Sequence, residues 1–185
     1  MNTIIRSTAL AVVLAALAGV TARAQEPQSA AAAARLTALL DAQKLDAIAA
    51  RDPDNPDRFI AALYFPGSQL LVVSAAYPVP PVLERRIAEH QYREAYTDLQ
   101  GAGVREGRFF VTDLQADGLR AARERGEPFD IAYTDGTTRV SYDGDWKGQK
   151  LTEEQYTGLF RDHDARYARL LDVLARAVDA GSDDA

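Results

Sequence analysis

The chain has 185 residues and a formal net charge of −6, with no cysteine and one methionine, Met1. Without cysteine it forms no disulfide and offers no thiol nucleophile or iron–sulfur ligand. The acidic balance disfavours nucleic acids and anionic membranes as partners, because both are bound through basic surfaces. The length predicts a single domain with a sizeable core.

The N-terminal segment has the pattern of a secretory signal peptide. Met1 to Arg6 is short and positively charged, Ser7 to Val20 is apolar, and Ala22-Arg23-Ala24 is a small-residue cleavage motif. The apolar run is shorter than the roughly 20 residues that a membrane-spanning helix needs. The pattern predicts export to the periplasm and cleavage near Ala24. Of the 21 basic residues, two arginines lie in this segment, so 19 basic and 27 acidic residues remain, a net charge of −8.

The first part of the remaining domain, residues 25–180, is predicted to combine a helix with a less helical segment. Residues 30–43 place several leucines on one face, which predicts an amphipathic helix. Residues 44–51 alternate only in part and are less helical. They end at residues 52–57, where two prolines lie among aspartates and an asparagine, a composition typical of turns.

Residues 58–77 give the clearest structural signal of the domain. Two nearly continuous apolar runs, 59–65 and 70–77, flank Pro66-Gly67-Ser68. Both runs are rich in residues that favour strands, and Pro-Gly is typical of a tight turn. The pattern predicts a central hairpin whose strands are buried on both faces.

A proline-rich corner follows the hairpin. Pro81 can begin a helix, because its missing N–H costs little there, so residues 82–90 are predicted to be helical. Residues 92–99 fit helical spacing and strand alternation alike, and we favour a strand. A glycine-rich turn then leads to a predicted strand over residues 108–114.

Asp135-Gly136 is typical of a two-residue type I′ turn and predicts a second hairpin. Counting outward from this turn pairs Ile131 with Val140 and Phe129 with Tyr142 on one face. The other face then carries mostly polar residues, including Asp130. A single register thus separates apolar from polar side chains on both strands.

The domain is predicted to end in a long helix. Thr152 to Gln155 has the sequence of a capping box, and an apolar stripe at helical spacing runs from Tyr156 to Val178. His163 lies within this stripe, so we expect a half-buried structural histidine and not a metal ligand. Residues 181–185 are predicted to form a disordered acidic tail. The fold class that follows is α+β: an antiparallel sheet or small split β-barrel with a long C-terminal helix packed on it.

The candidate ligand-binding group surrounds the proline-rich corner. Aromatic and guanidinium side chains gather there in sequence and could line a pocket; they are Tyr77, Arg85, Arg86, Tyr92 and Tyr96. The oxygen-rich residues 52–57 suggest calcium, but the spacing of an EF-hand loop is missing, so a proline-braced turn is favoured. No catalytic motif is present in the sequence, and we expect no catalytic residue and no metal.

The order of these elements resembles the flavin-binding split barrel of pyridoxamine-phosphate-oxidase-like proteins. In that family a basic residue near the strand-to-helix corner holds the flavin phosphate, a position that would correspond to Arg85 or Arg86. The segments RFIAALYFPGSQLLVVSA, YREAYTDL and YDGDWKGQKLTEEQY are also similar to those of uncharacterised secreted bacterial proteins.

The function expected from the sequence is that of a periplasmic, non-enzymatic protein that binds a small ligand or an envelope partner. It carries no cofactor in this interpretation. The alternative, which follows from the split-barrel resemblance, is a protein associated with FMN or haem. A third hypothesis is an envelope interaction module that presents a sheet edge to its partner.

Overall fold

The computed structural model describes residues 26–76, 81–101, 109–121, 130–134, 138–141 and 151–183. The predicted signal peptide and Tyr77 lie outside these ranges. The strands are β1 (Ala47–Asp52), β2 (Asn55–Phe65), β3 (Leu70–Ala76), β4 (Phe109–Asp113), β5 (Ile131–Thr134) and β6 (Thr138–Ser141). The helices are α1 (Ala30–Gln43), α2 (Val82–Ala88), α3 (Tyr92–Gly101) and α4 (Glu153–Asp183).

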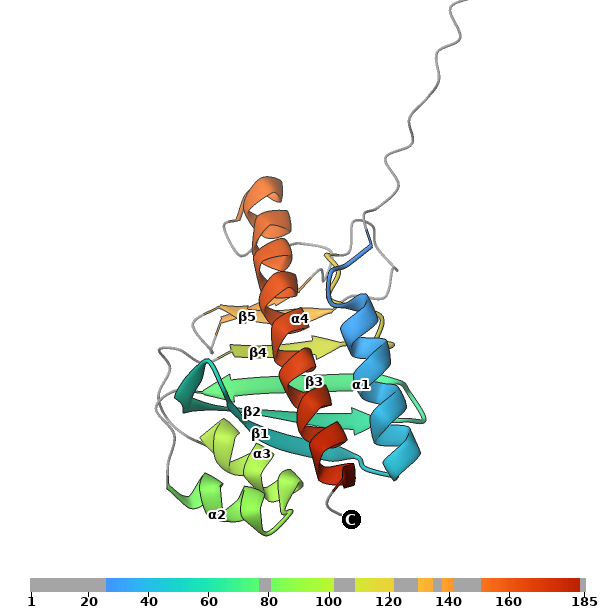
Figure 1. Ribbon diagram of the computed structural model, residues 1–185. Helices are drawn as coiled ribbons and strands as arrows, with labels where there is room; N and C mark the ends of the chain where they lie inside the picture. The colour runs from blue at the N-terminus through green and yellow to red at the C-terminus, as the bar shows by residue number, and fades with distance from the viewer. Residues whose placement is uncertain are drawn as a thin grey trace, which may run out of the picture.

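The strands form one antiparallel sheet in the order β1-β2-β3-β4-β5-β6 (Figure 1). The described strands form an open sheet, with β1 and β6 at opposite edges, so they do not close into a barrel. The α+β class and the long C-terminal helix are confirmed. The predicted central hairpin is also confirmed, since Phe65 pairs with Leu70 across residues 66–69, which include the predicted Pro66–Ser68 turn.

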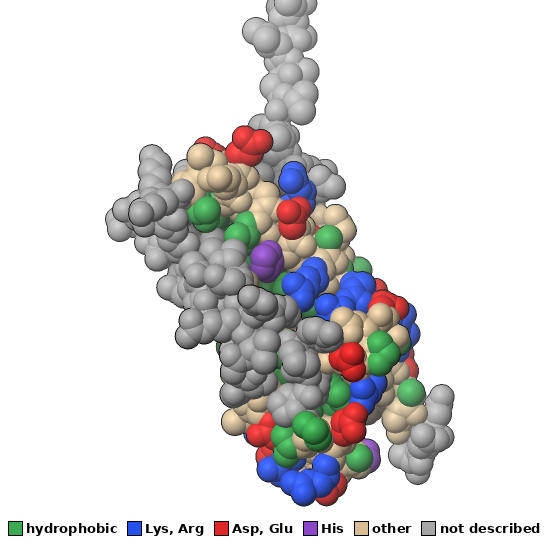
Figure 2. Space-filling model, turned by 90° about the vertical axis from the view of Figure 1, so that its left-hand side faces the viewer, with side chains coloured by type: hydrophobic (Ala, Val, Ile, Leu, Met, Phe, Trp, Pro, Cys, Tyr) green, Lys and Arg blue, Asp and Glu red, His purple; other side chains and the backbone are tan. Residues whose placement is uncertain are grey.

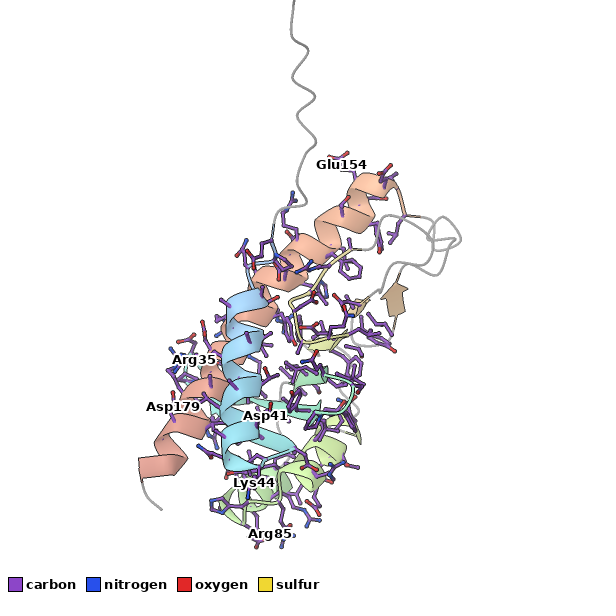
Figure 3. The ribbon with its side chains drawn as sticks, turned by 90° about the vertical axis from the view of Figure 1, so that its right-hand side faces the viewer. Arg35, Asp41, Lys44, Arg85, Glu154 and Asp179 are labelled. Carbon is purple, nitrogen blue, oxygen red and sulfur yellow. The ribbon has the colours of Figure 1, made fainter. Side chains whose placement is uncertain are left out.

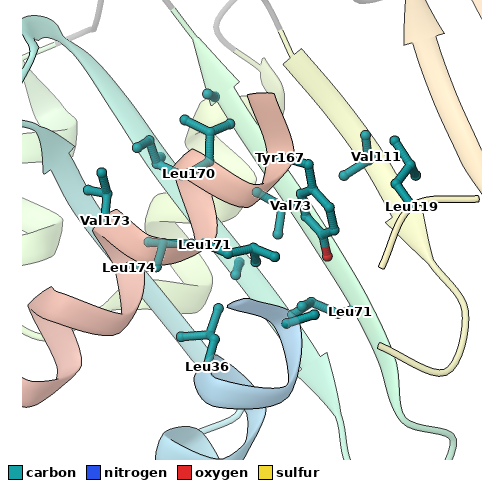
Figure 4. Close-up of a cluster of buried hydrophobic side chains, with 14 of the residues drawn as sticks. Leu36, Leu71, Val73, Val111, Leu119, Tyr167, Leu170, Leu171, Val173 and Leu174 are labelled. Atoms are coloured by element: carbon teal, nitrogen blue, oxygen red, sulfur yellow. The ribbon is translucent and has the colours of Figure 1, made fainter. Parts of the chain in front are cut away.

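One face of the sheet is covered by α1 and α4, and we call it the covered face (Figure 1). Alternate strand residues such as Val73 and Val111 are fully buried against Leu36 of α1 and Leu171 of α4 (Figure 4). Outside this core, Arg35 of α1 and Asp179 of α4 form an ion pair at 2.6 Å (Figure 3). The helical stripe predicted for the C-terminal segment is therefore the face that packs on the sheet.

On the other face, α3 covers β1, β2 and β3, and α2 packs on α3. The smaller core on this face includes Phe59 and Ala61 of β2. Leu83 of α2 and Ala95 and Leu99 of α3 also belong to it. This arrangement corrects the strand predicted for residues 92–99. Ala95 and Leu99, four residues apart, face the same core, so helical spacing prevails over the alternation.

The hairpin of β5 and β6 has a different register from the predicted one. Ile131 pairs with Ser141 and Ala132 with Val140, one residue away from the predicted pairing, and Phe129 and Tyr142 lie outside the described residues. The shift leaves three residues between the paired ends Thr134 and Thr138, not two. In the observed hairpin, Ala132 is completely buried in the core and Ile131 is half-buried. The prediction assumed that apolar residues face inward, whereas a buried Asp130 lies on the inward side.

The predicted capping box of α4 is confirmed. The Gln155 N–H donates to Thr152 Oγ1 at 3.1 Å, and the Thr152 N–H donates to Gln155 Oε1 at 2.8 Å. At its other end α4 continues to Asp183, beyond Gly181, where the sequence predicted the tail to begin. No helix within the described part of the chain is long and apolar enough to cross a membrane.

Candidate functional site

The predicted Tyr- and Arg-rich group is divided among different environments. Arg85 is exposed on α2 and points away from the sheet (Figure 3). Arg86 is half-buried; its Nη1 donates to Gln91 Oε1, and its Nε lies 3.5 Å from Asp98 Oδ2. Arg86 therefore joins α2 to α3 through an ion pair, although its buried Nε and Asp98 Oδ2 make no hydrogen bond. Tyr77 lies outside the described residues, so the structure does not place it with the others.

Tyr92 and Tyr96 lie one turn apart on α3 and are both half-buried. Burial raises the pKa of Tyr92 above its ordinary value. Burial, and then the neighbouring Tyr133, raises the pKa of Tyr96 to about 12. The Tyr92 ring meets the His90 ring edge to face with centroids 5.8 Å apart, and both Tyr92 and Tyr96 pack against the smaller core. Tyr133, whose charge influences the pKa of Tyr96, belongs to a second surface.

This second surface is the part of the sheet that lies beyond α3, and we call it the open face. It consists of two rows of neighbouring residues, and every member is half-buried. The first row is Phe110 and Tyr133, and the second is Leu63, Val72, Thr112 and Ile131. The Phe110 and Tyr133 rings meet edge to face with centroids 4.8 Å apart, a favourable aromatic arrangement.

The open face corrects the expectation that β2 and β3 are buried on both sides. Leu63 and Val72 are only half-buried, and nearby Phe65, at the end of β2, is 39% exposed. Alternate residues of the same strands, such as Ala62 and Val73, are completely buried on the covered face. A continuous apolar run does not show which of its residues a helix covers. For that reason the sequence did not indicate this surface.

A group of buried carboxylates lies on the covered side of the molecule. Asp164 of α4 accepts hydrogen bonds from the Gln28 N–H at 2.7 Å and the Ser29 N–H at 3.1 Å. The Ser29 hydroxyl also donates to Asp164, while it accepts from the Leu119 N–H at 2.9 Å. Ser29 thus links the segment before α1, the loop after β4 and α4.

Asp113, at the end of β4, binds the same loop. It accepts from the Asp117 N–H at 3.3 Å, the Gly118 N–H at 3.1 Å and the Tyr167 hydroxyl at 3.2 Å. Burial raises the pKa of Asp113 to about 7, although the bonds from Gly118 and Tyr167 favour the charged form.

Asp130, just before β5, completes the group. It accepts from the Leu114 N–H at 2.8 Å and the Arg120 N–H at 2.6 Å. Burial, and then the charge of Asp113, raises its pKa to about 8. Each oxygen of Asp113, Asp130 and Asp164 accepts a bond from a backbone N–H or a hydroxyl. We therefore assign these three carboxylates a structural role and call them the carboxylate clasp.

The oxygen-rich turn at residues 52–57 is held by arginines. Asp52 is completely buried and accepts hydrogen bonds from Arg58 and Arg169. Burial alone would raise the pKa of Asp52, but the bonds from Arg169 and Arg58 lower it below its ordinary value. Asp54 is paired with Arg169 at 2.8 Å. Guanidinium groups therefore occupy the positions around these carboxylates that a calcium ion would need.

His163 is half-buried, as predicted. Its Nδ1 lies 3.0 Å from the Leu159 carbonyl oxygen and its Nε2 lies 3.2 Å from the Tyr133 carbonyl oxygen. Its ring stacks on Phe109 with centroids 5.5 Å apart. These contacts place the imidazole in the packing between α4 and the sheet. Within the described residues, no group of three acidic or histidine side chains is arranged to hold a metal ion.

Comparison with family models, with curated proteins and with solved structures finds no match to this chain.

Proposed function

We propose that the chain is a non-enzymatic binding protein of the periplasm and that its open face receives the apolar surface of an envelope protein. The observation that carries this proposal is the exposure pattern of the sheet. Six neighbouring residues from β2, β3, β4 and β5 are all half-buried, and five of them are apolar or aromatic. Contiguous apolar surface of this kind is typical of interaction sites.

A protein partner suits this surface better than a small molecule. Small ligands are bound in concave sites that enclose most of their surface, whereas the open face is one side of a sheet. Aromatic residues are enriched in the centres of protein interfaces, and the Phe110–Tyr133 pair lies within the open face. The phenol group of Tyr133 would add a polar contact to the partner. The periplasmic location rests on the signal peptide pattern alone.

The test uses protein purified from the periplasm, whose mass reports cleavage after Ala24. Partners are selected from solubilised envelope proteins, purified, and titrated against the wild-type chain. Ile131→Thr and Phe110→Thr should each weaken binding by about ten-fold, since a central interface residue contributes more than about 1 kcal/mol. Ile87→Thr is the matched control, because Ile87 is a half-buried isoleucine on α2, away from the open face.

Three outcomes would contradict the proposal. One is the absence of any saturable partner of the wild-type chain. Another is a partner whose affinity is unchanged by Ile131→Thr and Phe110→Thr. The third is a small molecule that raises the melting temperature of the wild type but not of Ile131→Thr, which would assign the open face to a small ligand.

A further inference from the structure

Three arginines gather between α4 and the β1–β2 hairpin, on the side of the molecule away from the open face. They are Arg58 of β2 and Arg166 and Arg169 of α4, and we call them the arginine cluster. Figure 2 shows basic side chains grouped beside a histidine near the middle of one side of the molecule. Arg166 and Arg169 follow His163 at intervals of three residues, which places all three on one side of the helix.

Two members of the cluster are neutralised by carboxylates. Arg58 Nε donates to Asp52 Oδ2 at 2.7 Å. Arg169 donates to both oxygens of Asp52, at 3.3 and 3.1 Å, and to Asp54 at 2.8 Å. The two oxygens of Asp52 are therefore saturated with donors, and neither remains to pair with a third guanidinium.

Arg166 is this third guanidinium, and no acidic residue in the described part of the chain forms an ion pair with it. It is half-buried, and its guanidinium carbon lies 4.7 Å from the centroid of the Phe109 ring. Burial, and then the positive charges of Arg58 and Arg169, lowers the pKa of Arg166, while the attraction of Asp52 opposes this only in part. The folded protein thus holds a desolvated cation beside two others.

Within the cluster, three guanidinium groups face two carboxylates, so one positive charge is uncompensated in a protein whose overall charge is negative. A guanidinium presents N–H donors in a planar fork that matches the oxygen atoms of carboxylates and phosphates. The Phe109 ring supports one side of the Arg166 fork and limits the positions it can adopt. An anion at this position would remove the repulsion that the cluster otherwise retains.

We propose that Arg166, supported by Arg58 and Arg169, forms a binding site for a small oxyanion of the phosphate, sulfate or carboxylate class. The site is separate from the open face, so it holds whether or not a partner binds there. Arg166 provides the direct contact. Arg58 and Arg169 hold Asp52 and Asp54 through hydrogen bonds and ion pairs, so neither carboxylate neutralises Arg166.

The experiment titrates phosphate, sulfate and acetate separately into the purified chain, with chloride at matched ionic strength as the reference. Isothermal titration calorimetry and the melting temperature are both recorded. The expected result is a saturable rise in melting temperature for at least one oxyanion and none for chloride. Binding of phosphate and sulfate but not acetate would indicate that the ligand is a phosphate-type group. Binding of acetate alone would indicate that the ligand is a carboxylate.

Arg166→Gln should weaken oxyanion binding about ten-fold or more, because it removes a charge-assisted hydrogen bond. Arg166→Lys keeps the charge without the fork and should bind with intermediate affinity; it also serves as the test if Arg166→Gln does not fold. Arg161→Gln is the matched control on the same helix, since the Arg161 side chain is 76% exposed. Equal binding by wild type and both Arg166 variants would overturn the proposal, as would the absence of saturable binding to the wild type.

Discussion

The two faces of the sheet are built from the same strands, yet they differ in how completely helices cover them. The covered face receives α1 and the 31-residue α4, whereas the opposite face receives α2 of 7 residues and α3 of 10 residues. A helix rises about 1.5 Å per residue, so α3 is about 15 Å long, and neighbouring strands lie about 4.8 Å apart. Helix α3 contacts β1, β2 and β3, and the described residues of that face beyond it stay half-buried.

The difference extends to the polar groups. The carboxylate clasp lies entirely on the covered side, where its acids bind backbone N–H groups of the segments that close the core. The open face has instead the aromatic pair Phe110 and Tyr133 and no buried acid among its six residues. Stability should therefore depend mainly on the covered face. The open face is the surface for which we propose a binding role.

The largest effect should be a decrease in stability as the pH rises, and it should originate on the covered side. Burial raises the pKa of Asp113 to about 7 and that of Asp130 to about 8. A carboxyl group whose pKa is raised by folding contributes its full stabilisation at pH values below the pKa of the unfolded chain, about 4. This stabilisation is lost as the pH rises through the folded-state pKa values of about 7 and 8. The lowered pKa of Asp52 acts oppositely, but only at acidic pH, below about 4.

Urea unfolding at several pH values between 5 and 8 measures this effect directly. We expect the free energy of unfolding to fall across this range and Asp113→Asn to reduce the slope. Asp162→Asn is the control, because the Asp162 side chain is 78% exposed and should leave the slope unchanged. A free energy of unfolding that rises with pH in this range would refute the assignment.

The second prediction compares the loss of stability when either of two leucines, on adjacent strands and opposite faces of the sheet, is replaced by alanine. Leu71 is completely buried on the covered face, whereas Leu63 is a half-buried member of the open face. Leu71→Ala should cost about 2–5 kcal/mol, because it removes buried surface and leaves a cavity. Leu63→Ala should cost about 1 kcal/mol or less, since much of its surface is already in water. Equal costs in denaturant unfolding would mean that the two faces are equally packed.

These contrasts show which features the sequence could predict. The hairpin at Pro66–Ser68 and the capping box at Thr152 depend on neighbouring residues, and both were predicted correctly. The register of β5 and β6 depends on the clasp, where Asp130 faces inward to bind Leu114 and Arg120. That arrangement is tertiary, so the turn sequence and the apolar pattern led to a register wrong by one residue.

The candidate sites were harder to predict than the fold for a related reason. The Tyr- and Arg-rich group consists of residues close in sequence, but among its described members Arg86 pairs with Asp98, Arg85 is exposed, and Tyr92 and Tyr96 pack on the smaller core. The open face and the arginine cluster each combine distant segments. Phe109 and Arg166, for example, are brought together only when α4 packs on β4. No local pattern contains that information.

The last effect concerns Gly118, which lies in the loop bound by the clasp on the covered side. Its φ is +93°, and a Cβ atom there would lie 2.8 Å from both Ala30 N and Pro27 Cβ. Gly118→Ala should therefore cost about 1–3 kcal/mol through backbone strain and contact with the segment before α1. Gly181→Ala is the control, because Gly181 is helical with no atom within 4 Å of an added Cβ, and it should stabilise the fold by up to about 1 kcal/mol. Denaturant unfolding measures both, and a neutral Gly118→Ala would show that the loop can move away from α1 without weakening the covered face.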